Sequence, residues 1–121
     1  MAPRSNCPIA NALDLIGDRW TLVIVRDLMF SSRRRYGELL HGPEGITTNI
    51  LADRLKRLEA VGILHKSAYQ DRPPRYEYAL TDKGLDLYDT LCAVIRWGGK
   101  HVPGSTVISD ESLAAMDPRD G

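Results

Sequence analysis

The chain has 121 residues, 43% of them hydrophobic and 26% charged, which suits one globular domain with a modest core. It has no apolar run near the roughly 18 residues of a membrane span and no signal-peptide pattern. Composition therefore argues against a membrane protein and predicts a cytoplasmic one. The formal net charge of zero argues against broad polyanion binding.

The charges are unevenly distributed along the chain. Residues 33–75 contain nine basic and five acidic residues, a net charge of +4, whereas the segment after Pro103 contains one basic and four acidic residues, a net charge of −3. An acidic end thus masks a basic middle, and nucleic-acid binding stays open. We expect residues 1–103 to form a single domain and residues 104–121 to form an acidic extension.

The N-terminal part predicts two helices after a short arm. Cys7-Pro8 opens the first, because proline suits the first helical position. Gly17 ends this helix, and Asp18 can cap the next one. The second helix, within residues 20–29, is apolar on nearly all sides and belongs in the centre of the fold. The first helix has one apolar stripe, made by Ile9, Leu13 and Ile16.

Residues 34–61 predict a helix-turn-helix pair. A short first helix ends at Gly42, and the turn follows. The second helix begins at Thr47, whose hydroxyl can accept a hydrogen bond from a first-turn amide, and it ends at Gly62. Helical spacing predicts that one face of this helix is buried, through Leu51, Leu55 and Leu58.

The opposite face of the second helix is polar and suits insertion, N-terminus first, into a DNA major groove. Asn49 can pair bidentately with adenine, and Lys56 can contact guanine. Asp53 is awkward there, because it repels phosphate unless it pairs with Lys56 or Arg57 or accepts from a cytosine amine. A solvated face is the alternative. The residues predicted to contact DNA from this helix are Thr47, Thr48, Asn49, Ala52, Arg54 and Lys56.

A hairpin with a basic tip follows the pair. Residues 63–69 and 76–80 have strand composition, and the two prolines and charges of residues 70–75 cannot continue a sheet core. The pattern is typical of the wing of a winged helix, in which Arg72 and Arg75 reach the minor groove or backbone. Three arginines before the first helix of the pair are further phosphate candidates, with solvation as the alternative: Arg33, Arg34 and Arg35.

Residues 82–97 predict one long helix, capped by Thr81 and ended by the glycines at 98–99. This helix has two apolar stripes, more than one small core needs, so the second can be buried against another chain. Because sites for helix-turn-helix proteins are commonly paired, we expect a twofold dimer. Near the end, Ser109 can cap a weak helix that runs through Met116.

The two cysteines have different surroundings. Cys7 lies at a helix N-terminus, where the helix dipole stabilises a thiolate, although an inert thiol is the alternative. Cys92 lies within an apolar stripe and is expected in the core. The cysteines and histidines lack metal-ligand spacing, and no phosphate loop, carboxylate pair or nucleophile motif supports an enzyme. We therefore expect no metal, no cofactor and no catalytic residues.

Taken together, these motifs resemble the HxlR-type winged-helix transcriptional regulators, relatives of the MarR group. The resemblance covers most of the chain, through residues 7–8, 12–13, 16–20, 35–39, 46–59, 75–78, 80–81 and 97–98. It implies an α+β, mainly helical fold: a winged helix-turn-helix with a two-stranded wing and N- and C-terminal dimerisation helices. It also implies a homodimer on an inverted-repeat operator in double-stranded DNA, a recognition helix within residues 46–59 and a wing tip at residues 70–75.

The resemblance also implies a role for Cys7, because in several similar members a cysteine at this position senses oxidants, quinones or aldehydes. The chain lacks a clearly matching second redox cysteine, which argues against an intrachain disulfide and leaves an intersubunit bond from Cys7 to Cys7 or Cys92. We predict a dimeric, sequence-specific transcriptional regulator that responds to oxidants or electrophiles through Cys7. The alternatives are a protein-binding winged helix, a regulator gated by a small electrophile or aromatic ligand at the dimer interface, and, more distantly, a thiol enzyme.

Overall fold

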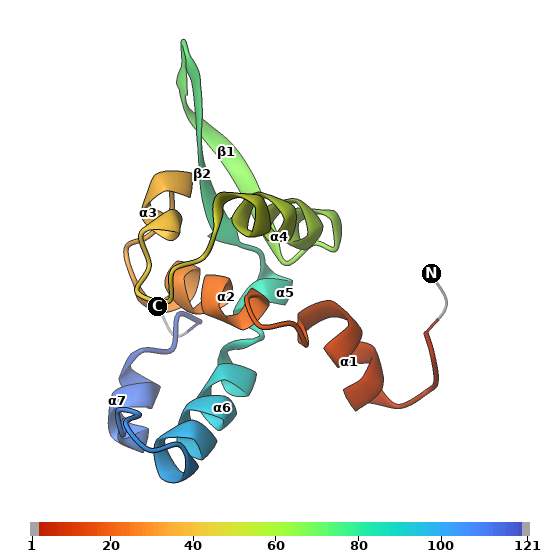
Figure 1. Cartoon of the computed structure of the whole chain (residues 1–121), viewed down its shortest axis with the longest axis vertical. Coiled ribbons are helices and arrows are strands. Elements are labelled where there is room, and N and C mark those ends of the chain that lie inside the picture. The colour runs from red at the N-terminus through yellow and green to blue at the C-terminus, as the bar shows by residue number, and fades with distance from the viewer. Residues whose placement is uncertain (1–2, 120–121) are drawn as a thin grey trace.

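The computed structural model describes residues 3–119 of the chain. Its elements, in order, are α1 (Pro8–Ile16), α2 (Thr21–Phe30), α3 (Tyr36–Leu40), α4 (Thr48–Ala60), β1 (Leu64–Asp71), β2 (Pro74–Leu80), α5 (Asp82–Leu85), α6 (Tyr88–His101) and α7 (Asp110–Ala115). Helices α2, α3 and α4 form the body, the hairpin projects from it, α6 and α7 lie opposite the hairpin, and α1 extends to one side (Figure 1). The predicted mainly helical winged helix-turn-helix is confirmed. Within residues 3–119, no helix has both the length and the apolar character needed to cross a membrane.

Pro8 and Gly17 bound α1 as predicted, and Asp18 binds the backbone amides at the start of α2, although Trp20 is the residue that directly precedes that helix. Pro8 is the first residue of α1, and the amide of Gly17 donates to the Leu13 carbonyl at 2.8 Å to close it. The Asp18 carboxylate accepts from the backbone amides of Trp20 and Thr21, at 2.9 and 3.0 Å, just before and at the start of α2. These bonds satisfy amides that have no partner within a helix.

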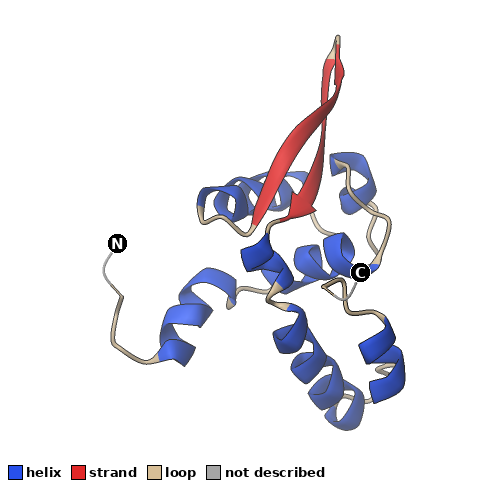
Figure 2. Cartoon of the chain, turned by 180° about the vertical axis from the view of Figure 1, so that it is seen from behind, coloured by secondary structure: helices blue, strands red, loops and turns tan. Residues whose placement is uncertain are grey.

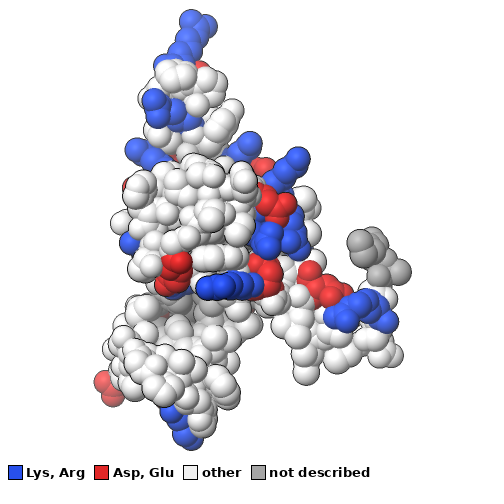
Figure 3. Space-filling view, viewed as in Figure 1, with Lys and Arg blue, Asp and Glu red and all other residues white. Residues whose placement is uncertain are grey.

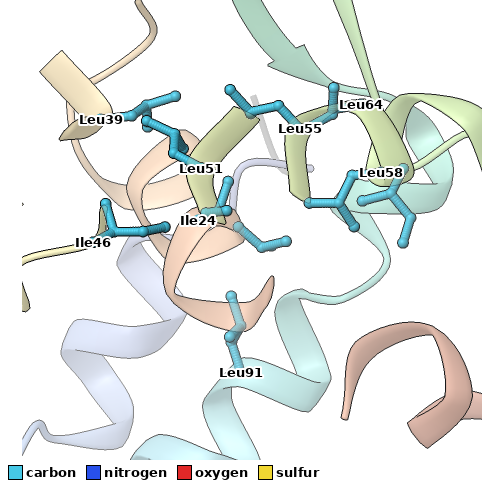
Figure 4. Packing of buried hydrophobic residues seen from close by; sticks show 10 residues of the cluster. Ile24, Leu39, Ile46, Leu51, Leu55, Leu58, Leu64 and Leu91 are labelled. Atoms are coloured by element: carbon cyan, nitrogen blue, oxygen red, sulfur yellow. The ribbon is translucent and has the colours of Figure 1, made fainter. Parts of the chain in front are cut away.

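The core lies where α4 crosses α2. Leu51, Leu55 and Leu58 are buried, as predicted, and they pack in one cluster with Ile24 of α2 (Figure 4). Neighbouring elements complete this cluster with Leu39, Ile46, Leu64 and Leu91. Burying one such side chain stabilises the fold by about 1.5–3 kcal/mol, so these leucines fix which face of α4 points outward.

Both ends of α4 match the prediction. The Thr47 hydroxyl accepts from the Ile50 amide at 3.4 Å, and Gly62 has φ of 79° after the helix. Glycine reaches this left-handed conformation without the penalty of a Cβ atom. Local side-chain chemistry therefore sets the length of α4, while packing sets its orientation.

The hairpin is longer than predicted. Gln70 pairs with Arg75 and Asp71 with Pro74, which leaves Arg72 and Pro73 as the turn. The expectation that residues 70–75 would leave the sheet was wrong. The tip extends beyond the helices (Figure 2), and each strand of a two-stranded sheet has a free edge, so Pro74 is tolerated without a ladder hydrogen bond.

The prediction of a single helix at residues 82–97 was also wrong, because the chain bends between α5 and α6. The Thr81 hydroxyl caps α5 as expected, accepting from the Gly84 amide at 3.2 Å. A Cβ atom at Gly84 would lie 2.2 Å from the Ile63 carbonyl oxygen, so α5 is pressed against the start of the hairpin. Helix α6 then continues through Gly98 and Gly99, since each glycine costs a helix only about 1 kcal/mol.

The C-terminal segment folds back on α6. Ser109 caps α7 as predicted, accepting from the Ser112 amide at 3.1 Å. Leu113 is buried against Tyr88 and Cys92 of α6, and the Tyr88 hydroxyl donates to the Leu113 carbonyl. Cys92 is therefore a core residue, as predicted, and the chain itself covers one of the two apolar stripes of α6.

Candidate nucleic-acid interface

The outward face of α4 carries five of the six residues of this helix that are predicted to contact DNA. Thr47 and Thr48 are exposed at its N-terminal end, and Asn49, Ala52 and Lys56 are exposed further along the helix. The leucine face opposite them is buried. Two of these residues, Ala52 and Lys56, line a groove together with Tyr36 of α3 and with Lys66 and Tyr78 of the hairpin. Helix α4 itself lies at the base of the hairpin (Figure 1).

Helix α3 is tied to the first turn of α4. The Tyr36 hydroxyl donates to the Thr48 carbonyl at 3.0 Å. The Glu38 carboxylate accepts from the backbone amides of Arg34 and Arg35, at 3.1 and 2.9 Å, and these bonds lower the pKa of Glu38. The arginine segment is therefore fixed in its backbone before any ligand binds.

The three arginines before α3 have different surroundings. Arg33 lies 3.8 Å from the Asp27 carboxylate, and Arg34 accepts the Tyr78 amide of β2 on its carbonyl at 2.7 Å. The guanidinium carbon of Arg35 lies 3.8 Å from the centre of the Tyr69 ring, a cation–π contact with β1. The contacts of Arg34 and Arg35 place this part of the arginine segment beside the hairpin, so its positive charge adds to that of the hairpin.

The basic residues of the hairpin extend this surface outward. Figure 3 shows Lys and Arg atoms at the tip of the hairpin and along its length. Arg72 and Arg75 are exposed, and the Gln70 side-chain amide closes the tip by donating to the carbonyls of Arg72 and Pro73, both at 3.2 Å. Arg75 also lines, with Arg35, a cavity of about 350 Å³ between α3 and the hairpin.

Asp53, the awkward residue of the polar face, is neutralised by neighbours on its own helix. It forms an ion pair with Arg54, and its carboxylate lies 3.9 Å from the Arg57 guanidinium. Arg57 is one of the partners that the sequence offers Asp53, whereas the shorter pair with Arg54 was not predicted. The carboxylate thus repels an approaching phosphate less than its sequence position indicates.

Arg54 is turned away from the other predicted contacts. Its Nε donates to Asp18 Oδ1 at 3.0 Å, and its side chain is only 21% exposed. Burial alone would raise the pKa of Asp18, but hydrogen bonds from the Thr21 hydroxyl, the Trp20 amide and the Arg54 guanidinium outweigh it and hold that pKa well below its usual range. Arg54 therefore lies between α4 and the start of α2.

An unpredicted ion pair between Arg26 and Glu44 joins α2 to the turn before α4, and Arg26 also pairs with its neighbour Asp27. Arg26 of α2 donates to Glu44 from both terminal nitrogens, at 2.7 and 2.8 Å, and to the buried carboxylate of Asp27 at 2.8 Å. The pair with Arg26 lowers the pKa of Glu44. A sequence signal existed, because Arg26 and Asp27 are the only charged residues in the apolar stretch 21–30.

Cys7 is exposed directly before α1, and Cys92 is buried under α7; both are free thiols. The Cys7 amide donates to Ser5 Oγ at 3.1 Å, and its carbonyl accepts from the Asn11 amide. Cys7 is therefore open to reagents in this chain, whereas Cys92 is not. Within residues 3–119, no three His, Cys, Asp or Glu side chains are grouped so that they can hold a metal ion.

Sequence comparison assigns most of this chain to one family. The model of the HxlR-like helix-turn-helix family matches residues 15–106. An uncharacterised HTH-type transcriptional regulator of Synechocystis is 38% identical over 92 residues, covering 76% of this chain and 67% of that protein. A regulator of the same description from Mycobacterium tuberculosis is 38% identical over 95 residues, which cover 78% of this chain and 59% of that protein. The chain spans about three fifths of the mycobacterial relative.

Solved structures have the same architecture. A regulator described as MarR family, from Porphyromonas gingivalis, has a TM-score of 0.73 and 29% identity, covering 84% of this chain and 99% of that one. The redox regulator HypR in its oxidized form has a TM-score of 0.71 and 32% identity, covering 78% and 97%. The reduced form of the Bacillus subtilis regulator YodB has a TM-score of 0.66 and 28% identity, covering 84% and 100%.

Proposed function

Because this chain belongs to the HxlR-like helix-turn-helix family of transcriptional regulators, we propose that it acts as a homodimer that reads an inverted-repeat operator through α4. The observation that carries the proposal is the two-faced character of α4. Its leucines are buried against α2, and its polar residues are exposed beside α3 and the hairpin. A helix held in this way can enter a major groove while its buried leucines keep their contacts with the core.

The exposed residues of α4 suit direct readout of base edges. The Asn49 amide can pair with adenine, Lys56 can donate to guanine, and the Ala52 methyl group can contact a thymine methyl. Thr47 and Thr48, at the helix N-terminus, suit phosphate contacts, because unpaired amides and the helix dipole there favour anions. Arg34, Arg35, Arg72 and Arg75 supply positive charge on either side.

Replacing the wing arginines tests the phosphate contacts. Arg72→Ala and Arg75→Ala are each expected to weaken binding to operator and to unrelated duplexes by similar factors, because phosphate contacts carry no sequence information. Each should lower the slope of log affinity against log salt by about 1. Fluorescence anisotropy between about 50 and 200 mM salt measures both quantities.

The matched control is Lys100→Ala, which removes an exposed positive charge from α6, on the side of the molecule opposite the hairpin. It should leave affinity and slope unchanged. Unchanged slopes in both wing variants would mean that the hairpin does not touch the DNA backbone.

Two apolar surfaces support the homodimer. Ile9 and Leu13 of α1 are 70% and 54% exposed. Val94 and Trp97 are exposed on α6, the helix that lies opposite the hairpin (Figure 1). None of the nine residues of α1, all of them described, is buried in this chain. Exposed apolar stripes of this kind are typical of protein–protein contacts, and a second copy of the chain can cover both.

We further propose that Cys7 senses oxidants or electrophiles, which the exposure of its thiol and the likeness to HypR support. In wild type, a quinone should lower operator affinity by about tenfold, the effect of a typical coupling free energy. Cys7→Ser should lose this response and Cys92→Ala should keep it, because Cys92 is covered by α7. Operator binding before and after quinone treatment measures the difference.

A response that persists in Cys7→Ser would exclude the thiol and favour the second candidate, a regulator gated by a small aromatic ligand. One observation supports that candidate. An apolar cavity of about 380 Å³ lies between α2, α6 and the C-terminal segment, with Phe30, Leu91 and Met116 in its wall. This volume suits a small aromatic molecule. The protein-binding alternative was favoured by the zero net charge and by Asp53, and the pairing of Asp53 with Arg54 weakens the second of these two supports.

A further inference from the structure

Arg54 has different partners from the other polar residues of α4. Its Nε donates to Asp18 at 3.0 Å, and its Nη1 pairs with Asp53. Thr48, Asn49, Ala52 and Lys56 are exposed, whereas the Arg54 side chain is mostly covered. Donors already committed to two carboxylates are poorly placed to bind a phosphate, so the structure indicates a different role for this arginine.

Asp18 is held as firmly as Arg54. Its carboxylate accepts from the amides of Trp20 and Thr21 and from the Thr21 hydroxyl, which fixes it at the beginning of α2. Gly17, the residue before it, closes α1, and a Cβ atom there would lie 2.4 Å from the Leu13 carbonyl oxygen. Only Gly17 therefore separates the last residue of α1 from Asp18, the residue whose carboxylate pairs with Arg54 of α4.

We propose that Arg54 is a positioning residue: its ion pair with Asp18 fixes the angle at which α4 meets DNA and joins that angle to the orientation of α1. The proposal rests on the proposed function, because it concerns how the recognition helix is presented. None of the nine described residues of α1 is fully buried, and Ile16, at the C-terminal end of the helix, packs against the core cluster. A second copy or a change at Cys7 can therefore shift the N-terminal part of α1 while Ile16 keeps its core contact. The shift then reaches α4 through Gly17, Asp18 and Arg54.

A second ion pair provides a matched comparison. Arg26 and Glu44 join α2 to the turn before α4, at 2.7 and 2.8 Å. This pair also anchors the recognition helix, but it starts from the later half of α2 and has no direct link to α1. Glu44→Gln should therefore disturb the placement of α4 without affecting its connection to α1.

The first test is a double-mutant cycle on operator affinity with Asp18→Asn and Arg54→Gln. Asparagine still caps α2, and glutamine keeps most of the side-chain length, so both variants should fold, which circular dichroism checks. Each single change should lower affinity by about 5–10-fold, and the double variant should be no worse than either, because the two residues act as one unit. The salt slope should equal that of wild type, because no phosphate contact is lost.

Arg72→Ala is the comparator, since loss of a wing phosphate contact should lower the salt slope by about 1. The opposite pattern would overturn the proposal: a reduced slope in Arg54→Gln, together with unchanged or tighter binding in Asp18→Asn, would make Arg54 a direct DNA contact. Failure of the proposed function would look different, because wild type itself would then not bind duplex DNA.

The second test measures the link to α1 by amide hydrogen exchange with and without operator DNA. Coupling between two sites is reciprocal, so DNA bound at α4 should slow exchange in α1 of wild type. This protection should be lost in Arg54→Gln and kept in Glu44→Gln, at DNA concentrations that saturate each variant. Equal protection of α1 in all three proteins would overturn the link between Arg54 and α1.

Discussion

Leu51→Ala is expected to lower the free energy of unfolding by about 3–4 kcal/mol, because the side chain lies at the centre of the core and its removal leaves a cavity. Leu51 is 0% exposed and packs where α4 crosses α2. Urea denaturation followed by circular dichroism measures the change, and an unaltered slope against urea would show that the unfolded state is not affected.

The control is Val107→Ala, at a valine that is 79% exposed, where the loss should stay below about 0.5 kcal/mol. A loss below about 1 kcal/mol for Leu51→Ala would contradict the orientation of α4. In that case the polar face of α4 would not be free for DNA. The stability measurement therefore also tests whether α4 can bind DNA through this face.

Asn49→Ala should lower operator affinity by about 10–100-fold, because a bidentate contact with a base contributes about 1–3 kcal/mol of discrimination. Affinity for unrelated duplexes should change little, since the amide reads a base edge and not the backbone. Lys56→Ala should weaken binding to both kinds of DNA if Lys56 contacts phosphate, and to the operator alone if it reads guanine. Competition anisotropy at one fixed salt concentration separates these effects.

Asn6→Ala, which removes an exposed asparagine ahead of α1, is the control and should bind as wild type does. Equal loss of affinity for operator and unrelated DNA in Asn49→Ala would mean that Asn49 touches only the backbone. No loss for either DNA would remove Asn49 from the interface and would move readout to another part of α4.

Local side-chain chemistry made much of the fold predictable. Thr47, Thr81 and Ser109 cap helices as expected, Gly62 ends α4, and the leucine spacing of α4 identifies its buried face. Each of these features depends on residues within one or two helical turns. The strong local signals also explain why the resemblance to the family could be recognised from short motifs.

The errors have their origin in contacts between distant residues. The bend between α5 and α6 lies beside the close approach of Gly84 to the carbonyl of Ile63, which is 21 positions earlier. A contact between residues so far apart cannot be predicted from a local sequence pattern. The hairpin was predicted too short because its prolines were judged by the rules of a central strand, whereas both strands here have free edges.

In the candidate site too, features that depend on neighbouring residues were predictable, and features that depend on distant residues were not. Helical periodicity correctly placed Asn49, Ala52 and Lys56 on the exposed face of α4. It could not give the partner of Arg54, because Asp18 lies 36 residues earlier and meets it only through the packing of α2 on α4. The same contact explains Asp53, whose charge is balanced by an arginine that is itself held in place.

Readout of DNA by α4 can be tested by enriching bound sequences from a random duplex library with the wild-type protein. We expect an inverted repeat with half-sites about 10 base pairs, or a multiple of one helical turn, apart. We also expect Asn49→Ala to lose the preference at one position in each half-site. A folded wild-type protein that enriches no sequence above the starting library would contradict the claim that α4 reads DNA.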